Sequence, residues 1–224
     1  MRYENVFPGS FISRPNRFIA LAEINGTETI CHVKNTGRCR ELLVPGCRIF
    51  LSKSDNLKRK TKYDLIAVQK GKRLINMDSQ APNKAVMEFI PKLFRNVTVI
   101  KPEYTYKNSR FDFYIETECE KIFLEVKGVT LEENGIVRFP DAPTQRGIKH
   151  VSELSECIKE GFSAYVFFVI QMENVLYFEP NDRLHKEFGD ALRDAALQGV
   201  RIIAYDCKVT ENTLEIKEPV EVRL

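Results

Sequence analysis

Two short stretches in the middle of the chain constrain its fold most. Residues 110–115 and 122–128 both alternate in side-chain character and are rich in aromatic and branched residues, which is typical of β-strands. If the chain turns back halfway between them, Asp112 and Glu125 form a cross-strand pair, with Cβ atoms about 5 Å apart. Lys127 then projects on the same face as Glu125, because side chains alternate along a strand.

Two carboxylates placed this close repel each other, and a divalent metal is the natural compensating cation. Mg²⁺ is usually held by one or two carboxylates and completes its shell with water and substrate phosphates, and Mn²⁺ suits the same oxygen ligands. Asp112 and Glu125 are therefore the expected metal ligands. Lys127 would then orient the attacking water or stabilise the transition state of phosphodiester hydrolysis.

The spacing of these three catalytic candidates has a known parallel. An Asp followed thirteen positions later by Glu-x-Lys resembles the signature of the PD-(D/E)XK nuclease superfamily. The alternative for such a motif in isolation is a solvated strand face whose Glu and Lys form ordinary exposed ion pairs.

Charge is distributed unevenly along the 224 residues. Residues 1–80 hold 15 Lys and Arg against 7 Asp and Glu, a balance of +8, whereas residues 81–224 hold 19 against 24, a balance of −5. This asymmetry indicates that the N-terminal part meets a polyanion. The alternative is the ordinary fluctuation of charge along any chain.

The N-terminal part has the pattern of a small all-β barrel. Turn signals such as Asn25-Gly26 and Pro45-Gly46 separate short alternating stretches. Such short strands favour a closed barrel of the OB kind, because closure removes exposed edges, and OB barrels commonly bind single-stranded nucleic acid. The expected strands are residues 17–24, 28–34, 47–53, 63–70 and 73–77.

Two basic clusters in this part are predicted to contact phosphates. One lies between the third and fourth expected strands beside Tyr63, and the other surrounds the turn at residues 35–37. Many neutralised phosphates add up to a salt-sensitive affinity. Solvated hairpin tips are the alternative. The predicted contacts are Lys58, Arg59, Lys60 and Lys62 in the first cluster and Lys34, Arg38 and Arg40 in the second.

The remainder of the chain has the pattern of a layered α/β domain. Glu88 lies on its first expected helix and is a candidate third metal ligand, with an exposed helix residue as the alternative; Pro91 is expected to bend or end that helix. Strand, helix and strand in succession imply a mixed sheet flanked by helices. Helices are expected at residues 83–90, 144–160 and 184–198, and buried strands at 164–170 and 200–205.

The helix expected at residues 144–160 presents a basic face. Arg146, Lys149 and His150 are three and four positions apart and therefore share one side. Arg146 and Lys149 are predicted to approach nucleic-acid phosphates, and the alternative is a set of surface ion pairs. His150 has the chemistry of a general acid, although a metal nuclease of this design does not need one.

The sequence favours a cytoplasmic protein without a membrane partner. Its six Cys have no C-x-x-C spacing, which indicates reduced thiols. The first residues lack the apolar region of a signal peptide, and the apolar run at residues 164–170 is too short to cross a bilayer. The sequence leaves the oligomeric state open, and an oligomer is compatible with it.

Several stretches together resemble the sugar fermentation stimulation protein A (SfsA) family. They are residues 32–43, 109–113, 125–127 and 139–150, in the same order as in the family. The resemblance implies an OB domain at residues 1–80, a PD-(D/E)XK nuclease-like domain at residues 81–224, and DNA binding linked to the regulation of sugar utilisation genes. It also implies that Asp112, Glu125 and Lys127 are the nuclease motif.

Two functions follow from these observations. The first is a Mg²⁺- or Mn²⁺-dependent nuclease whose barrel captures DNA and whose second domain hydrolyses it. The second is a non-catalytic DNA-binding regulator that retains the nuclease fold, although no helix-turn-helix pattern supports sequence-specific repression. RNA stays an open alternative to DNA, because stacking and phosphate contacts serve either polymer.

Overall fold

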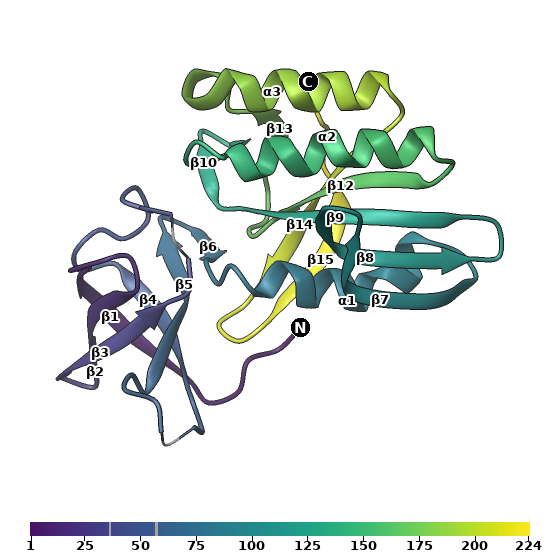
Figure 1. Ribbon diagram of the computed structural model, residues 1–224. Helices are drawn as coiled ribbons and strands as arrows, with labels where there is room; N and C mark the ends of the chain where they lie inside the picture. Colours follow the sequence, from purple (N-terminus) through teal and green to yellow (C-terminus); the bar gives the residue numbers. More distant parts are fainter. Residues whose placement is uncertain (36, 57) are drawn as a thin grey trace.

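The computed structural model describes residues 1–35, 37–56 and 58–224. Thr36, in the second predicted basic cluster, and Leu57, in the first, lie outside the described residues. The chain forms a small barrel beside a larger layered domain (Figure 1). Within the described ranges, no helix is both long enough and apolar enough to cross a membrane.

The barrel has five strands and is closed. Its strand order is β3-β2-β1-β4-β5, and parallel pairing of β3 with β5 completes the circle. Alternate residues of the strands, such as Ala20, Val33, Ile49 and Leu65, are fully buried inside it. The strands are β1 (Val6–Ser13), β2 (Ile19–Ile24), β3 (Thr27–Val33), β4 (Arg48–Lys53) and β5 (Tyr63–Lys70), with β6 (Arg73–Asn76) extending β5 as a hairpin.

The barrel confirms the predicted OB fold, but the sequence pattern predicts β2 to β6 and misses β1. Pro8 and Gly9 interrupt β1, and both residue types weaken a strand signal. The glycine has a structural reason. A Cβ at Gly9 would lie 2.6 Å from the carbonyl oxygen of Glu23, so the close approach of β1 to β2 requires its absence.

The second domain is built on a mixed six-stranded sheet in the order β15-β14-β12-β9-β8-β7. Strands β9, β12 and β14 are parallel neighbours, and the other pairs are antiparallel. These strands are β7 (Val97–Tyr106), β8 (Ser109–Thr117), β9 (Lys121–Val129), β12 (Ser163–Ile170), β14 (Arg201–Val209) and β15 (Leu214–Pro219). A smaller sheet contains β10 (Leu131–Glu133), β11 (Ile136–Phe139) and β13 (Tyr177–Pro180).

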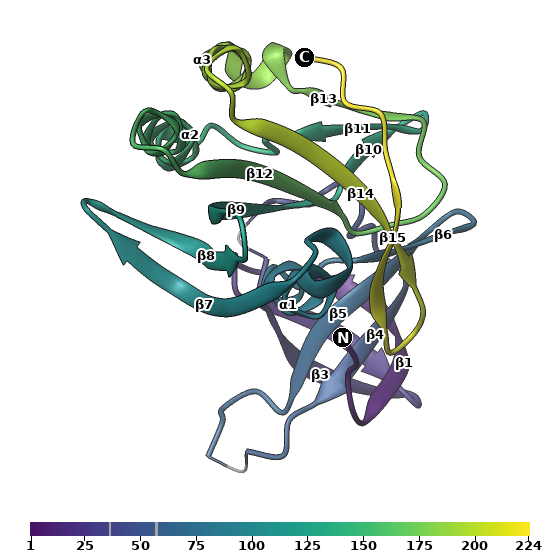
Figure 2. The ribbon, with the colours of Figure 1, turned by 90° about the vertical axis from the view of Figure 1, so that its right-hand side faces the viewer.

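Helices cover both faces of the large sheet, as predicted. Helices α2 (Gln145–Lys159) and α3 (Asp182–Leu197) lie together over one face, and α1 (Ala81–Leu93) lies on the other (Figures 1 and 2). Thr144 caps α2 by accepting the Gly147 N–H. Pro91 does not end α1, because it stands in the last turn, where only one ladder hydrogen bond is lost.

Each face of the sheet has its own apolar core, and β9 contributes to both. Phe123 packs in the cluster on the side of α2, whereas Leu124 and Val126 pack in the cluster on the side of α1. Because side chains alternate, Glu125 and Lys127 share the face of Phe123. The sheet therefore directs them toward α2.

A buried ion cluster joins the barrel to the second domain. The Glu132 side chain of β10 is only 5% exposed and receives two cations from the β5–β6 hairpin. Lys70 Nζ lies 2.8 Å from Glu132 Oε2, and an Arg73 guanidinium nitrogen lies 2.7 Å from Oε1. These contacts fix the barrel at one place beside the sheet.

The first residues of the chain form a second connection. Arg2 pairs with Thr213 in an isolated bridge, and the Tyr3 N–H donates to the Asn212 carbonyl at 2.8 Å. The Tyr3 ring is buried, and its hydroxyl lies 3.3 Å from Asp78. The chain passes from β6 to α1 between Asn76 and Ala81, but residues 1–3 cross to the second domain.

Candidate metal-dependent active site

The β8–β9 hairpin places Asp112 beside Glu125. Phe113 pairs with Leu124 in antiparallel register, and Asp112 and Glu125 are the next residues along the two strands. Glu125 contacts His150 of α2, whereas Asp112 accepts from Asn83 of α1. The expected hairpin is therefore present, but its ladder ends at Phe113 and Leu124, and the Asp112 carboxylate accepts from the backbone N–H of Val126, the residue after Glu125.

Asp112 is half-buried, and each of its oxygens has a donor. Asn83 Nδ2 donates to Oδ1 at 2.7 Å, and the Val126 N–H donates to Oδ2 at 2.7 Å. Burial and then the charge of Glu125 raise the pKa of Asp112 to about 6, although the two donors and Lys127 act in the opposite direction. A nearby cation would favour the ionised form.

Glu125 is buried more deeply, with 3% of its surface exposed. Its Oε1 contacts both Lys127 Nζ, at 2.5 Å, and His150 Nδ1. Burial alone would raise the pKa of Glu125, but the contacts with His150 and Lys127 outweigh burial and lower it. Its Oε2 is buried and has no hydrogen-bond partner among the described residues.

This donor set fits a hard divalent cation. An unpartnered buried acceptor costs about 1–3 kcal/mol, so Glu125 Oε2 is an oxygen that a cation would satisfy. Within the described part of the chain, His, Cys, Asp and Glu form no metal cage of three or more residues. Asp112 and Glu125 would thus leave most of the metal shell to water and substrate, which Mg²⁺ and Mn²⁺ accept.

Gly128 allows the start of α1 to approach this site. A Cβ at Gly128 would lie 2.5 Å from Gln171 Oε1 and 2.9 Å from Pro82 Cγ. Asn83 follows Pro82 in α1, so the same close approach brings its amide to Asp112. Asn83 is not predictable as a site residue from the sequence, because an amide at the start of a helix signals only a cap.

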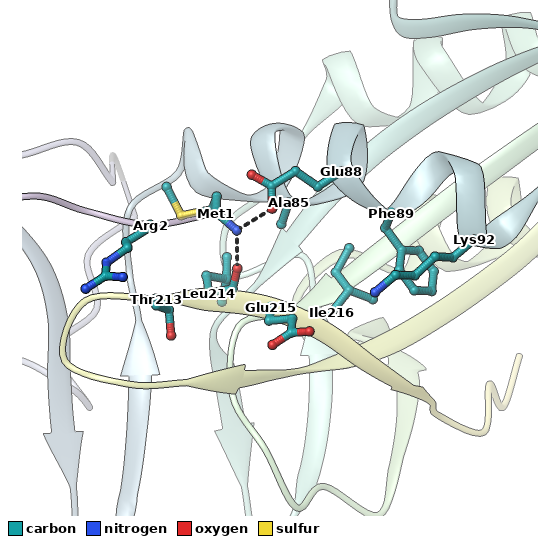
Figure 3. Close-up of a pocket in the computed structure, with 10 residues that line it drawn as sticks. All are labelled: Met1, Arg2, Ala85, Glu88, Phe89, Lys92, Thr213, Leu214, Glu215 and Ile216. Atoms are coloured by element: carbon teal, nitrogen blue, oxygen red, sulfur yellow. Dashed lines mark hydrogen bonds and ion pairs between the residues drawn. The ribbon is translucent and has the colours of Figure 1, made fainter.

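Glu88 does not reach the carboxylate pair, which corrects the expectation that it is a third metal ligand. Its carboxylate lies 2.7 Å from the Met1 amine, which also donates to the Leu214 carbonyl at 2.8 Å (Figure 3). The side chain is 63% exposed. Five positions along a helix correspond to about 140° of rotation, so Glu88 and Asn83 point in different directions.

Two predicted phosphate contacts are instead paired with buried carboxylates. Asp64 is buried and accepts from two guanidinium nitrogens of Arg59, at 3.0 and 2.5 Å. Lys34 Nζ lies 3.3 Å from Asp64 and 3.1 Å from Asp78. The expectation that Lys34 and Arg59 bind phosphate is corrected accordingly, because both side chains neutralise buried carboxylates.

Other predicted contacts lie on the barrel surface. Lys58, Lys60 and Lys62 are exposed on the loop between β4 and β5. On another side, Arg38 and Arg40 line a shallow hollow of about 450 Å³ together with Arg17, which the sequence analysis misses. Arg14 supports the rim of this hollow by donating to the carbonyl oxygens of Arg17, Asn35, Gly37 and Arg38.

The two cations predicted on α2 differ in their surroundings. Arg146 Nε donates to His150 Nε2 at 3.4 Å, which places Arg146 beside the carboxylate site. Lys149 Nζ instead donates to the Asn108 carbonyl at 3.3 Å, in the turn between β7 and β8, and lies 3.7 Å from Glu153. Of the two, Arg146 is linked directly to the residues around Glu125.

The site is expected to cost stability when no metal is bound. Because the pKa of Asp112 is raised in the folded state, the fold binds this proton more tightly than the unfolded chain does, so stability falls as pH rises from about 4 to 6. Asp112→Asn should therefore stabilise the metal-free protein at pH 7 by about 1–3 kcal/mol. Thermal unfolding in EDTA would measure the change.

The exposed carboxylate of Glu28, on β3, provides the control for this prediction. Glu28→Gln should leave the unfolding midpoint within about 1 °C of the wild type, as is usual for a surface substitution. A lower midpoint for Asp112→Asn than for the wild type would contradict the electrostatic account of the site.

Comparison with known proteins tests the resemblance seen in the sequence. The model of the SfsA N-terminal OB domain matches residues 12–77, and that of the sugar fermentation stimulation protein RE domain matches residues 80–213. This chain belongs to the SfsA family. The two matches meet at the connection between β6 and α1 of this chain.

Individual SfsA relatives agree over the full length. The sugar fermentation stimulation protein homologs of Clostridium beijerinckii and Ruminiclostridium cellulolyticum are 62% and 59% identical to this chain, and each alignment covers 100% of both proteins. A solved structure described as Pyrococcus furiosus SfsA in complex with Ca²⁺ is 27% identical, with a TM-score of 0.88, and the match covers 100% of this chain and 98% of that one.

Proposed function

We propose that this SfsA-family protein is a divalent-metal-dependent nuclease that hydrolyses phosphodiester bonds, with DNA as the expected substrate. The observation that carries the proposal is the pair formed by half-buried Asp112 and buried Glu125, in which Glu125 Oε2 has no partner among the described residues. Lys127 lies beside the pair on the same face of β9. A carboxylate pair with an adjacent ammonium suits the stabilisation of charge on a phosphate.

Each residue has a distinct role in this proposal. Asp112 and Glu125 would hold the cation, and Asn83 and the Val126 N–H keep Asp112 in place. When bound, Mg²⁺ or Mn²⁺ supplies Lewis acidity and lowers the pKa of coordinated water. Lys127, which neutralises Glu125 in the metal-free protein, would turn its ammonium toward the phosphate or the attacking water.

The relative from Pyrococcus furiosus supports a hard cation at this site. That structure is described as a complex with Ca²⁺. Ca²⁺ and Mg²⁺ both bind carboxylate and water oxygens, although Ca²⁺ accepts more ligands at longer distances. A family member that binds Ca²⁺ is consistent with carboxylates that bind Mg²⁺ or Mn²⁺ here.

The barrel is proposed to hold the nucleic acid through phosphate contacts. Two surfaces have the required charge: the arginine hollow, made by Arg17, Arg38 and Arg40, and the lysine loop, made by Lys58, Lys60 and Lys62. Such contacts position a polymer without reading its sequence.

Charge reversal distinguishes the contributions of these two surfaces. We expect two triple Glu variants, one of the arginine hollow and one of the lysine loop, to bind with a weaker salt dependence. In each, the slope of log K against log salt concentration should become less steep by about 2, because each lost phosphate contact removes about 0.7–0.9 from its magnitude. Titration of fluorescent single-stranded DNA at several salt concentrations would measure the slopes. Unchanged slopes in both triples would place the polymer on another surface.

Arg59 and Lys34 stay unchanged in those variants, because both neutralise the buried Asp64. Reversing either charge would place a second carboxylate beside the buried Asp64 and damage the barrel, so a loss of binding would have no clear cause. A circular dichroism spectrum and unfolding midpoint for each triple variant would check that the barrel is intact.

Cleavage of labelled single-stranded, duplex and branched DNA and of RNA tests the proposed function. We expect products in Mg²⁺ or Mn²⁺ that EDTA abolishes, and the substrate cleaved fastest would identify the polymer. Binding without cleavage on every substrate would overturn the nuclease proposal and support the non-catalytic regulator of sugar utilisation genes.

A further inference from the structure

The histidine on α2 is held between two partners. His150 is 7% exposed, and its Nδ1 contacts Glu125 Oε1 while its Nε2 accepts from Arg146 Nε at 3.4 Å. The Phe111 ring packs against it at an interplanar angle of 70°. Both ring nitrogens are therefore occupied inside the protein.

These partners select one tautomer of the imidazole. A neutral histidine has one donor nitrogen and one acceptor nitrogen. Arginine only donates, so the nitrogen facing Arg146 is the acceptor, and the proton resides on Nδ1. His150 consequently donates to Glu125 Oε1.

The His150 Nδ1–H donates to one oxygen of the Glu125 carboxylate and does not contact the other. Oε1 accepts hydrogen bonds from both Lys127 and His150, whereas Oε2 is buried without a partner among the described residues. A carboxylate fixed through one oxygen has its second oxygen in a defined direction. Outer residues that orient ligands in this way commonly change metal affinity by 10–100-fold when they are replaced.

We propose that His150 is a positioning residue that fixes the Glu125 carboxylate with Oε2 turned toward the cation, and that Arg146 maintains this arrangement by fixing the tautomer of His150. The inference rests on the proposed metal site. It assigns His150 no proton transfer to substrate, because Nδ1 and Nε2 both have protein partners and the ring is buried.

A pair of nearly isosteric substitutions tests the role of the donor. The amide nitrogen of Asn reproduces the place of a histidine Nδ1, whereas Leu has a similar shape without a donor. We expect His150→Leu to weaken Mn²⁺ binding by about 10–100-fold and His150→Asn to retain the wild-type affinity within about threefold. Isothermal titration of the metal-free protein with Mn²⁺ measures both without any assay of activity.

Arg146→Met provides a second test that leaves the buried ring in place. We expect Arg146→Met alone to weaken Mn²⁺ binding several-fold. Added to His150→Asn, the same substitution should not change Mn²⁺ affinity further, because Asn has no tautomer to fix. Lys159→Met is the matched control, since Lys159 is an exposed cation of the same helix and pairs with Glu156 on the surface. The control should bind Mn²⁺ as the wild type does.

The outcomes separate this inference from the proposed function. A wild-type protein that binds no Mn²⁺ would overturn both. Wild-type binding together with unchanged affinity in a folded His150→Leu variant would overturn only the role of His150. Equal loss of Mn²⁺ affinity in the Leu and Asn variants would show that the loss does not come from the missing hydrogen-bond donor. If His150→Leu does not fold, the comparison of Arg146→Met with the Arg146→Met/His150→Asn double variant tests the role of His150 instead.

Discussion

Glu125→Gln is expected to abolish metal-dependent cleavage. The amide preserves the size of the side chain but removes the charge and the carboxylate oxygen that would meet the cation. Losing about 4 kcal/mol of transition-state stabilisation corresponds to a rate reduction of about a thousandfold. Single-turnover cleavage of the best DNA or RNA substrate, with Mn²⁺ affinity measured in parallel, would test this expectation.

Lys127→Met distinguishes binding of the cation from metal-dependent cleavage. We expect this variant to bind Mn²⁺ within about tenfold of the wild type, because the carboxylates remain, yet to lose cleavage by at least about a hundredfold, the effect of a single preorganised donor. Binding of the nucleic acid should be little changed in both variants, since its proposed contacts are on the barrel. Cleavage by Glu125→Gln at the wild-type rate would exclude this site as the source of activity.

Glu132→Gln is expected to destabilise the junction between the barrel and the second domain. The substitution leaves the half-buried Lys70 and Arg73 against a neutral amide, and the loss of hydrogen bonds between charged groups costs about 1.5–3 kcal/mol. Urea unfolding at pH 7 would measure the loss. A matched change, Glu133→Gln, alters a mostly exposed neighbour and should cost less than about 1 kcal/mol.

The ion cluster at Glu132 should also make the stability of the protein sensitive to acid. Burial would raise the pKa of Glu132, but Lys70, the Gly135 N–H and Arg73 outweigh burial and lower it to about 2. Because the folded-state pKa lies below the unfolded value of about 4.5, the stabilisation is complete above pH 5 and is lost as pH falls from about 4.5 to 2. The wild type should lose stability over this range faster than Glu132→Gln. Parallel curves for the two proteins would contradict the role of this ion cluster.

The hairpin and the cap of α2 were predictable because each depends on local sequence. Alternation and a short turn fix the register of the hairpin, so the pairing of Phe113 with Leu124, next to Asp112 and Glu125, follows without knowledge of the rest of the fold. Thr144 likewise caps α2 through a hydrogen bond to a residue three positions away. A hairpin turn and a helix cap depend on residues close together in the sequence, so they form in the same way wherever the hairpin or the helix lies in the fold.

The errors arise where distant parts of the chain meet. Lys34 and Arg59 have the sequence context of surface cations, yet the fold brings both to Asp64. Glu88, the acidic residue of the first expected helix, contacts the start of the chain instead of the carboxylate pair. Strand β7 escapes prediction because it is an edge strand that contains Pro102, a residue tolerated only at such positions.

The bridge between residues 2–3 and 212–213 has a consequence for how the protein is made. At 5–20 residues per second, roughly 10–40 s separate the synthesis of Tyr3 from that of Asn212. The barrel has all its strands early in this interval, whereas Tyr3 must wait for its partner on the second domain. On the ribosome the barrel would therefore fold first and become fastened to the sheet only when translation is nearly finished.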